Sequence, residues 1–268
     1  LAVIFGSRLR CSLAVTLFVR GCVGCRGYVV RSRLCCLFAV ALFVRSCVVR
    51  SRLPCFLCVG AQKAGTTTLQ KLLWHHPKIH LPAKKEIHFF SLHYNKGLSW
   101  YGNHFLDSSD KSCIGEITPY YLFHPYAAQR IYNTLGSIRI IILLRDPLAR
   151  TISHYGHSRH LGFEDLSLEE ALKAESQRLE GADITLLRPD GVHQKHQECS
   201  YLSRSLYRSQ VHRYFKYFGR ENICILPSEF LFLKPWESLQ IIYQFLQIES
   251  HSKPDSRSLG VRANAGKF

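Results

Sequence analysis

The stretch "FLCVGAQKAGTTTLQKLL", Phe56 to Leu73, has the form of a phosphate-binding loop between a strand and a helix. In the loop that binds nucleoside triphosphates, G-x-x-x-x-G-K-[ST], a lysine follows the second glycine and reaches the β- and γ-phosphates. Gly60 and Gly65 have that spacing, but Thr66 follows Gly65, and the lysine, Lys63, lies between the glycines. The stretch therefore predicts a site for a phosphate or sulfate that is not the end of ATP. For the loop alone, a glycine turn with a threonine cap is the structural alternative.

From Pro54 onward the chain alternates between strands and helices. Short apolar runs predict buried strands at Cys55–Gly60, Ile138–Arg145 and Asn222–Pro227. Apolar residues at helical spacing predict helices at Thr66–His76, Asp146–His160, Leu166–Leu179, Ser205–Phe218 and Trp236–Ile248. This alternation is typical of a three-layer α/β fold, in which helices flank a mainly parallel sheet.

Two of the predicted helices carry N-terminal signals. Asp146 is an N-cap followed by proline at the first helical position, and Ser167 with Glu170 has the pattern of a capping box. Parallel sheets bind ligands at the carboxyl ends of their strands, where a helix N-terminus can meet an anion. The Gly60–Thr68 loop is predicted to lie at such a point.

Residues 1–53 form a separate Arg/Cys-rich segment that repeats itself: "SRLRCSLAVTLFVRGC" recurs as "SRLCCLFAVALFVRSC". Its longest charge-free apolar run, Leu34–Val44, is shorter than the ~20 residues that span a bilayer. Because the chain begins with Leu and contains no Met, we expect a gene-model artefact or a disordered repeat, with a targeting segment or surface arm as alternatives. The compartment is open: Golgi or membrane-associated if this segment is a true anchor, and cytoplasmic otherwise.

Charge and cysteine are both unevenly distributed. Residues 1–58 hold nine Arg and no acidic residue, whereas the remainder holds 26 basic and 19 acidic residues. That modest excess suits an anionic ligand and does not by itself imply nucleic acid. The aromatic residues of Ser205–Phe218 are interpreted as helix packing, with basic residues interleaved from Arg204 to Lys216, so no nucleic-acid partner is expected. Only Cys113, Cys199 and Cys224 lie beyond Cys58, and a single bridge among those three stays open.

The sequence does not predict a metal site. "IIILLRD" ends in Arg145 before Asp146, so no clear acidic residue follows a second strand to hold Mg²⁺. His154, His157 and His160 would form a stripe on one helix, but they lack nearby cysteine or acidic partners.

Four motifs in order, "GAQKAGTTTL", "KKEIHFF", "GEITPYYL" and "IILLRDPLARTISHY", resemble the sulfotransferase family. The likeness runs from about Pro54 to Phe268 and is to the carbohydrate-type and bacterial-like branch that includes the heparan sulfate sulfotransferases. The resemblance implies a P-loop NTPase-like α/β fold that uses 3′-phosphoadenosine 5′-phosphosulfate (PAPS) as co-substrate and needs no metal. It implies direct in-line transfer of a sulfonate to a hydroxyl, or less readily an amine, of a carbohydrate or small-molecule acceptor.

The resemblance also assigns the donor site. The Gly60–Thr68 loop would bind the 5′-phosphosulfate, with Lys63 neutralising the charge that develops as the sulfonate leaves. The 5′-phosphate would be bound by Thr66, Thr67 and Thr68. The 3′-phosphate would be bound by Arg145 and Ser153, which lie about two helical turns apart. Arg262, Asn264 and Lys267, in "GVRANAGKF", are candidates for a basic loop over the adenosine 3′-phosphate.

The catalytic base implied by the resemblance is Glu86, in "KKEIHFF", because a carboxylate can take the proton of the acceptor hydroxyl. His88 is the second candidate. A surface Lys–Glu pair beside buried phenylalanines is the structural alternative for this motif. Glu116 could orient Lys63 or the acceptor, or be a polar residue at a strand end.

The chain also departs from the family pattern. Ile117 stands where the heparan sulfate branch usually has lysine, which puts the polysaccharide acceptor in doubt. The family continues into a final helix, so we expect residues 54–268 to be a C-terminally truncated sulfotransferase domain. The alternatives are a P-loop kinase or nucleotidase, and an inactive donor-binding fragment.

Overall fold

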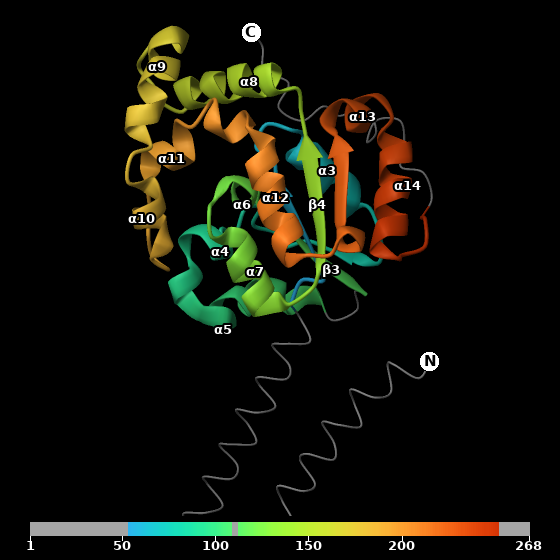
Figure 1. Cartoon of the computed structure of the whole chain (residues 1–268). Coiled ribbons are helices and arrows are strands. Elements are labelled where there is room, and N and C mark those ends of the chain that lie inside the picture. The colour runs from blue at the N-terminus through green and yellow to red at the C-terminus, as the bar shows by residue number, and fades with distance from the viewer. Residues whose placement is uncertain (1–52, 109–111, 252–268) are drawn as a thin grey trace, which may run out of the picture. The chain divides into compact units, whose positions relative to one another are not determined.

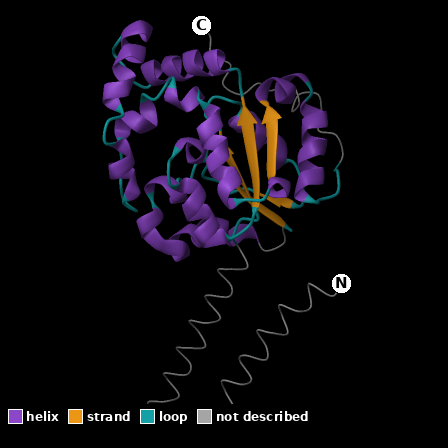
Figure 2. Ribbon diagram, viewed as in Figure 1, coloured by secondary structure: helices purple, strands orange, loops and turns teal. Residues whose placement is uncertain are grey.

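The computed structural model describes residues 53–108 and 112–251, which contain a five-stranded sheet flanked by helices (Figure 1). Its strands lie in the order β2-β3-β1-β4-β5, and all four pairings are parallel, so the arrows in Figure 2 point the same way. The strands are β1 (Phe56–Gly60), β2 (Ile79–His80), β3 (Cys113–Ile117), β4 (Arg139–Leu144) and β5 (Ile223–Pro227). The predicted parallel α/β fold is confirmed.

Helices cover both faces of the sheet, with α12 in front of β4 and α3 behind it in Figure 1. The longer helices are α3 (Thr66–Trp74), α7 (Ala127–Leu135), α8 (Pro147–His160), α9 (Leu168–Arg178), α12 (Tyr207–Tyr217) and α14 (Pro235–Leu246). The short ones are α4 (Phe89–Leu92), α5 (Gly97–Gly102), α6 (Tyr120–Phe123), α10 (Ala182–Leu187), α11 (Gln194–Glu198) and α13 (Ser228–Leu233). Single 3₁₀ turns are η2 (Tyr94–Lys96), η4 (Ser203–Ser205) and η5 (Arg220–Asn222), and η3 (Asn103–Ser108) is longer.

The three predicted strands are β1, β4 and β5, and the five predicted helices are α3, α8, α9, α12 and α14. All five residues of β1 are buried, as its unbroken apolar run requires in a sheet covered on both faces. The capping predictions are confirmed as well. The Asp146 carboxylate accepts from the Ala149 N–H at 2.7 Å, and Ser167 with Glu170 forms the capping box at the start of α9.

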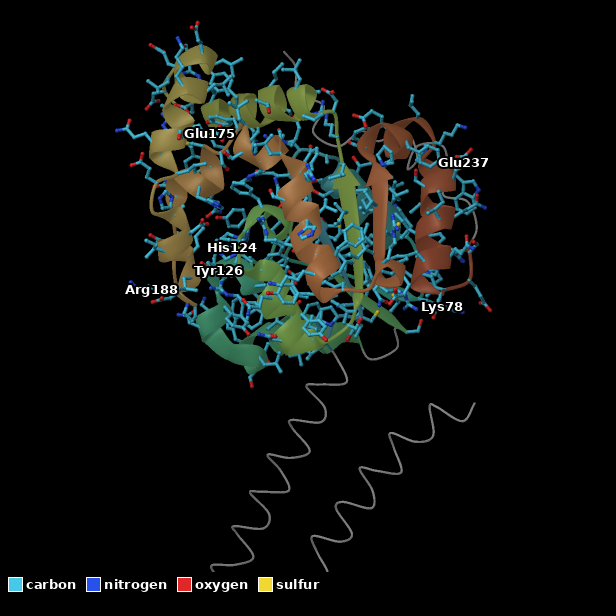
Figure 3. All side chains as sticks on the ribbon, in the orientation of Figure 1. Lys78, His124, Tyr126, Glu175, Arg188 and Glu237 are labelled. Atoms are coloured by element: carbon cyan, nitrogen blue, oxygen red, sulfur yellow. The ribbon has the colours of Figure 1, made fainter. Side chains whose placement is uncertain are left out.

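A buried arginine holds two of the short helices against α7. Arg130 on α7 donates to the carbonyls of Phe90 (3.2 Å), Leu186 (2.9 Å) and Arg188 (2.9 Å), which joins α4 and α10 to α7. Figure 3 labels Arg188 and Tyr126, which lie on the side of the molecule where α10 is found. Neither the two-residue strand β2 nor these short helices has a clear periodic pattern.

Several sequence expectations fall partly or wholly outside the described residues, among them those on the Arg/Cys-rich segment and on residues 252–268. The five described cysteines are all free, so the bridge left open among Cys113, Cys199 and Cys224 does not form. Between residues 53 and 251, wherever the structure describes the chain, no helix is long and apolar enough to cross a membrane.

Candidate functional site

The loop between β1 and α3 lies at the carboxyl edge of the sheet and opens onto a helix N-terminus. Helix α3 begins at Thr66, its N-cap is Gly65 with φ +88°, and no side chain in the described part of the chain caps it. The first N–H groups of a helix have no partner within the helix and carry its positive dipole end. Thr66 and Thr68 are buried at this end and Thr67 is half-buried. These features would suit an anionic ligand at the start of α3.

Both glycines of the loop are required by the close approach of other elements. A Cβ on Gly60 would lie 2.6 Å from Cβ of Leu122 and 2.9 Å from the Pro119 carbonyl oxygen. A Cβ on Gly65 would lie 2.8 Å from the ring of Phe232, at a left-handed φ that side chains rarely adopt. The spacing of the glycines thus reflects how α6 and α13 pack on the loop.

Replacing Gly60 by Ala should destabilise the fold by about 3 kcal/mol, because the new methyl group overlaps a Cβ and a backbone oxygen that cannot move away cheaply. The matched control is Gly181→Ala, which has φ +71° and ψ 1° in the left-handed helical region with nothing within 4 Å of the new Cβ, and should cost only about 1 kcal/mol. Urea unfolding midpoints measure both. Equal losses would show that Leu122 and Pro119 yield to the methyl group.

Lys63 lies at the centre of the loop and is held by Arg145, the residue that follows β4. The Arg145 guanidinium donates through Nη1 to the Lys63 carbonyl at 3.1 Å, and the Tyr207 hydroxyl donates to the Arg145 carbonyl at 3.0 Å. Burial lowers the pKa of Lys63, as do the charges of Arg145 and Lys85, against the opposing charge of Glu86. An anion bound here would relieve the repulsion that destabilises the Lys63 ammonium group.

Glu86 and His88 lie together in the segment that follows β2. The Glu86 N–H donates to the carbonyl of Ile117 at 3.2 Å, which attaches this segment to the end of β3. The Glu86 carboxylate is ion-paired with Lys85 and lies 3.5 Å from Nε2 of His88. Burial tends to raise the pKa of Glu86, but the hydrogen bond from His88 and the charge of Lys85 outweigh it and lower the pKa to about 2. Glu86 is therefore an ionised carboxylate at neutral pH.

The candidate catalytic residues also share an unusual backbone conformation. Four non-glycine residues of the described chain have positive φ, and three of them are Lys63 (+68°), Glu86 (+61°) and His88 (+58°), the fourth being Gln247. Such residues cost energy and persist where surrounding structure enforces them, commonly at functional sites. Three of the residues that the sequence proposed for the site thus share this conformation.

Helix α8 brings further side chains to the same place. Burial lowers the pKa of His157, the Lys63 charge acts in the same direction and the Glu86 charge opposes it, so His157 is in the electrostatic range of both. Ser153 precedes His157 by four residues and lies on the same helix face, half-buried. The structure thus gathers Lys63, Glu86 and Arg145, with Ser153 on the adjoining face of α8. Arg262, Asn264 and Lys267 lie outside the described residues.

The carboxylate of Glu116 on β3 is buried and accepts hydrogen bonds from neighbouring side chains. It is 1% exposed and accepts from the hydroxyls of Tyr101 (2.5 Å), Thr118 (2.6 Å) and Tyr121 (2.8 Å). Burial raises its pKa, although these hydrogen bonds oppose the shift. Of the roles left open for Glu116, the buried polar residue at a strand end is the one that the contacts support.

Two buried arginines behind the site were missed by sequence reasoning. Arg150 donates to the Ser205 hydroxyl (2.6 Å) and the Tyr201 carbonyl, and Arg204 donates to the Gln62 side chain in the loop. The Arg204 guanidinium also lies over the ring of Phe123, 4.9 Å from its centroid. Neither arginine has an ion-pair partner among residues 53–108 and 112–251, so both add positive potential near the loop. The hydrogen-bond acceptors of both arginines are distant in sequence, so the sequence alone does not show that these arginines are buried.

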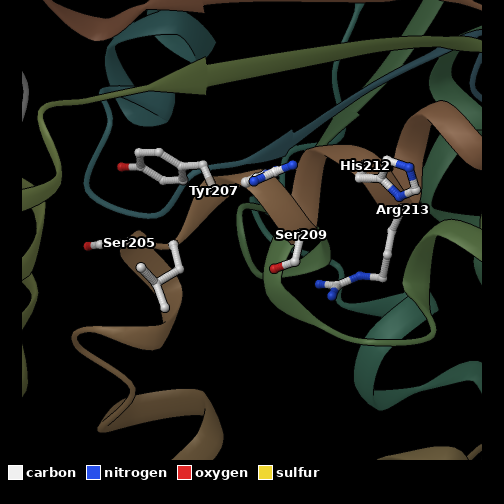
Figure 4. A pocket seen from close by; sticks show the side chains of 7 residues that line it. Ser205, Tyr207, Ser209, His212 and Arg213 are labelled. Carbon is white, nitrogen blue, oxygen red and sulfur yellow. The ribbon is translucent and has the colours of Figure 1, made fainter.

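A pocket of about 710 Å³ lies along the start of α12 (Figure 4). Ser205, Tyr207, Ser209, His212 and Arg213 line it together with Leu206 and Arg208. Tyr207 connects the pocket to the Arg145 carbonyl. Within the described ranges, no group of three or more His, Cys, Asp or Glu side chains is arranged to hold a metal ion.

The parallel sheet, the glycine loop and its uncapped helix define an α/β protein of the phosphate-binding-loop class. The chain belongs to the sulfotransferase family, because the family model described as the sulfotransferase domain matches residues 53–258, more than half of the chain. The predicted family is therefore confirmed, in place of the kinase or nucleotidase alternative.

Individual relatives are similar to this chain over part of their length. The chain is 28% identical over 199 residues to heparan sulfate glucosamine 3-O-sulfotransferase 5 of Homo sapiens, covering 74% of this chain and 54% of that protein. It is 41% identical over 109 residues to the membrane-associated sulfotransferase kil1 of Dictyostelium discoideum, covering 40% of this chain and 23% of that protein. The chain thus spans between about a quarter and a half of the length of these curated relatives.

Among solved structures, the fold is similar to that of a sulfotransferase from Alicyclobacillus acidocaldarius, with a TM-score of 0.65 and 28% identity. That match covers 80% of this chain and 87% of the other. It extends the similarity to nearly the whole of the bacterial chain.

Proposed function

We propose that this protein transfers a sulfonate group from PAPS to a hydroxyl group of a carbohydrate or small-molecule acceptor. The observation that carries the proposal is the convergence of Lys63, Glu86 and Arg145 at the carboxyl edge of the sheet, with Lys63 and Glu86 in left-handed conformations. The family supplies the reaction type, and the residues supply an anion loop, a cation and an ionised carboxylate in reach of one another.

In this proposal two parts of the site bind the donor: the loop between β1 and α3, and the pair Arg145 and Ser153. The N–H groups and hydroxyls of Thr66, Thr67 and Thr68 bind the 5′-phosphate, and Lys63 faces the oxygen that bridges phosphate and sulfonate. Arg145 and Ser153 bind the 3′-phosphate from β4 and α8. The fit rests on charge: burial and neighbouring cations lower the pKa of Lys63, and a dianionic group next to it reverses that shift.

Glu86 is the proposed base. As the acceptor oxygen forms its bond to sulfur, the Glu86 carboxylate takes the hydroxyl proton, and the bond from sulfur to the bridging oxygen breaks. Lys63 stabilises the negative charge on that departing oxygen. The products are a sulfated acceptor and adenosine 3′,5′-bisphosphate. His88 positions Glu86 through the contact at 3.5 Å and is the second candidate for the base.

A carbohydrate acceptor is favoured by the relative named as a heparan sulfate glucosamine 3-O-sulfotransferase. The pocket along α12 offers the exposed side chains of Arg208 and His212, which suit an acceptor with acidic groups. Ile117 distinguishes this chain from the usual heparan sulfate pattern. An acceptor screen with labelled PAPS, in which mono- and oligosaccharides compete with phenols and amines, separates these classes.

A binding titration tests the donor assignment. Adenosine 3′,5′-bisphosphate should bind with a far lower Kd than Mg-ATP, because the loop has no lysine after its second glycine to meet a γ-phosphate. Arg145→Ala should raise the Kd for the bisphosphate about 10- to 100-fold, the usual effect of losing a charged hydrogen bond. Arg220→Ala, at an exposed 3₁₀ turn, is the matched control and should leave the Kd unchanged. Tighter binding of Mg-ATP would exclude the proposal, and bisphosphate binding without transfer to any acceptor would identify an inactive donor-binding fragment.

A further inference from the structure

Two cysteine side chains meet at the amino ends of neighbouring strands. Cys55 directly precedes β1, Cys113 opens β3, and their Sγ atoms lie 3.4 Å apart. The Cys55 N–H donates to the Ile114 carbonyl at 2.8 Å, so strand pairing holds the two residues side by side. Paired strands lie about 4.8 Å apart, within the Cα separations of about 4.4–6.8 Å that a disulfide spans.

The two thiols differ in access and in acidity. Cys113 is 2% exposed, whereas Cys55 is half-buried. The hydrogen bond with the Cys113 thiol lowers the pKa of Cys55 to about 7 against the effect of burial, and the Ile114 backbone and the Arg139 charge act in the same direction. Since the thiolate is the nucleophile in thiol–disulfide exchange, Cys55 is the sulfur that a small disulfide would meet and react with first.

We propose that Cys55 and Cys113 are a reversible redox pair that closes to a disulfide by exchange with a small-molecule disulfide of the glutathione type. The Cys55 thiolate attacks one sulfur of the glutathione disulfide, forms a mixed disulfide and releases one glutathione thiolate. Cys113 then loses its proton, and its sulfur attacks the Cys55 sulfur and displaces the second glutathione thiolate. The protein is oxidised by two electrons, and the disulfide is reduced to two glutathione molecules, which take up the two cysteine protons.

The bond has a structural consequence at the edge of the sheet opposite the anion loop. It links positions 58 residues apart in sequence and joins the central strand β1 to its neighbour β3. Closing so long a loop restricts the unfolded chain and favours the folded state. The oxidised protein should therefore have a higher Tm than the reduced protein, by on the order of 10 °C.

Peptide mapping tests the pairing directly. The full chain is equilibrated with glutathione disulfide, alkylated to stop exchange, digested with trypsin and analysed by mass spectrometry. Cleavage after basic residues places Cys55 in peptide 53–63 and Cys113 in peptide 112–130. Peptide 53–63 also contains Cys58, so Cys58→Ser is mapped in parallel. Fragmentation of the wild-type peptide makes the same assignment if that variant does not fold.

We expect the two peptides joined through Cys55, two hydrogens lighter than their sum, and a rise in Tm that dithiothreitol reverses. The Cys113→Ser variant should carry glutathione on Cys55 and show no such rise. A glutathione adduct on Cys55 beside a free Cys113 in the wild type would overturn the proposal, as would a link through Cys58. A joined species with a Tm no higher than that of the reduced protein would overturn the stabilising role. None of these readouts depends on sulfonate transfer.

Discussion

Replacing Lys63 by Ala should lower kcat for sulfonate transfer by about 10²- to 10³-fold, the usual loss when one group that stabilises transition-state charge is removed. The reason is that Lys63 is the half-buried cation of the loop, held in place through its carbonyl by Arg145. Alanine keeps the Cβ, so the strain of the left-handed backbone at φ +68° is the same in both proteins. Initial rates with labelled PAPS at saturating acceptor measure the effect.

Lys71→Ala is the control for Lys63→Ala. Lys71 lies exposed in the last turn of α3, so its removal changes the net charge equally without touching the loop, and kcat should stay within about twofold. A higher KM for PAPS with an unchanged kcat in Lys63→Ala would contradict the proposed role, since that pattern belongs to a group that binds ground state and transition state alike.

Replacing Glu86 by Gln should lower kcat by about 10²- to 10⁴-fold, because the amide has nearly the same size as the carboxylate but cannot take the acceptor proton. Glu169→Gln is the matched control, because it removes an exposed carboxylate that pairs with Lys173 on helix α9. Transfer by Glu86→Gln at the wild-type rate would leave His88 as the base.

The pKa of Glu86 adds a dependence on pH. Because the folded pKa is about 2 and lies below the ordinary value of 4.5, the carboxylate stays ionised in the free enzyme well below neutral pH. The profile of kcat/KM should therefore show no acid limb from Glu86 between pH 4 and 6. For the same reason Glu86 stabilises the fold above about pH 4.5, and this contribution is lost as the pH falls towards 2. Urea midpoints should fall less steeply over that range in Glu86→Gln than in the wild type.

Both predictions concern residues that the sequence motifs picked out. The parts of the fold that the sequence predicted correctly have local signals. A loop between two glycines, a cap such as Asp146 and a capping box such as Ser167 with Glu170 depend on neighbours within a few residues. The unbroken apolar run at β1 reports burial on both faces. Such signals can be recognised in a linear chain.

Other parts of the site carried no local signal. No local pattern predicts the left-handed conformation of Lys63, Glu86 and His88, and Arg145, which donates to the Lys63 carbonyl, is 82 residues from Lys63. The same is true of Arg204, which reaches Gln62 across 142 residues. In isolation, an arginine at either position reads as an exposed charge, because only its distant partners show that it is buried or bound.

The sequence by itself determined the parallel α/β fold and the glycine loop with its displaced lysine, and its motifs proposed a short list of catalytic candidates. These follow from periodicity, glycine spacing and motif order, which act along the chain. Only the tertiary structure decided that Glu116 is buried and hydrogen-bonded, that His88 and Lys85 lower the pKa of Glu86, and that Cys55 meets Cys113. These outcomes depend on which side chains become buried and on which charges come close in space. Both are set by segments that are distant in the sequence, so a linear pattern does not show them.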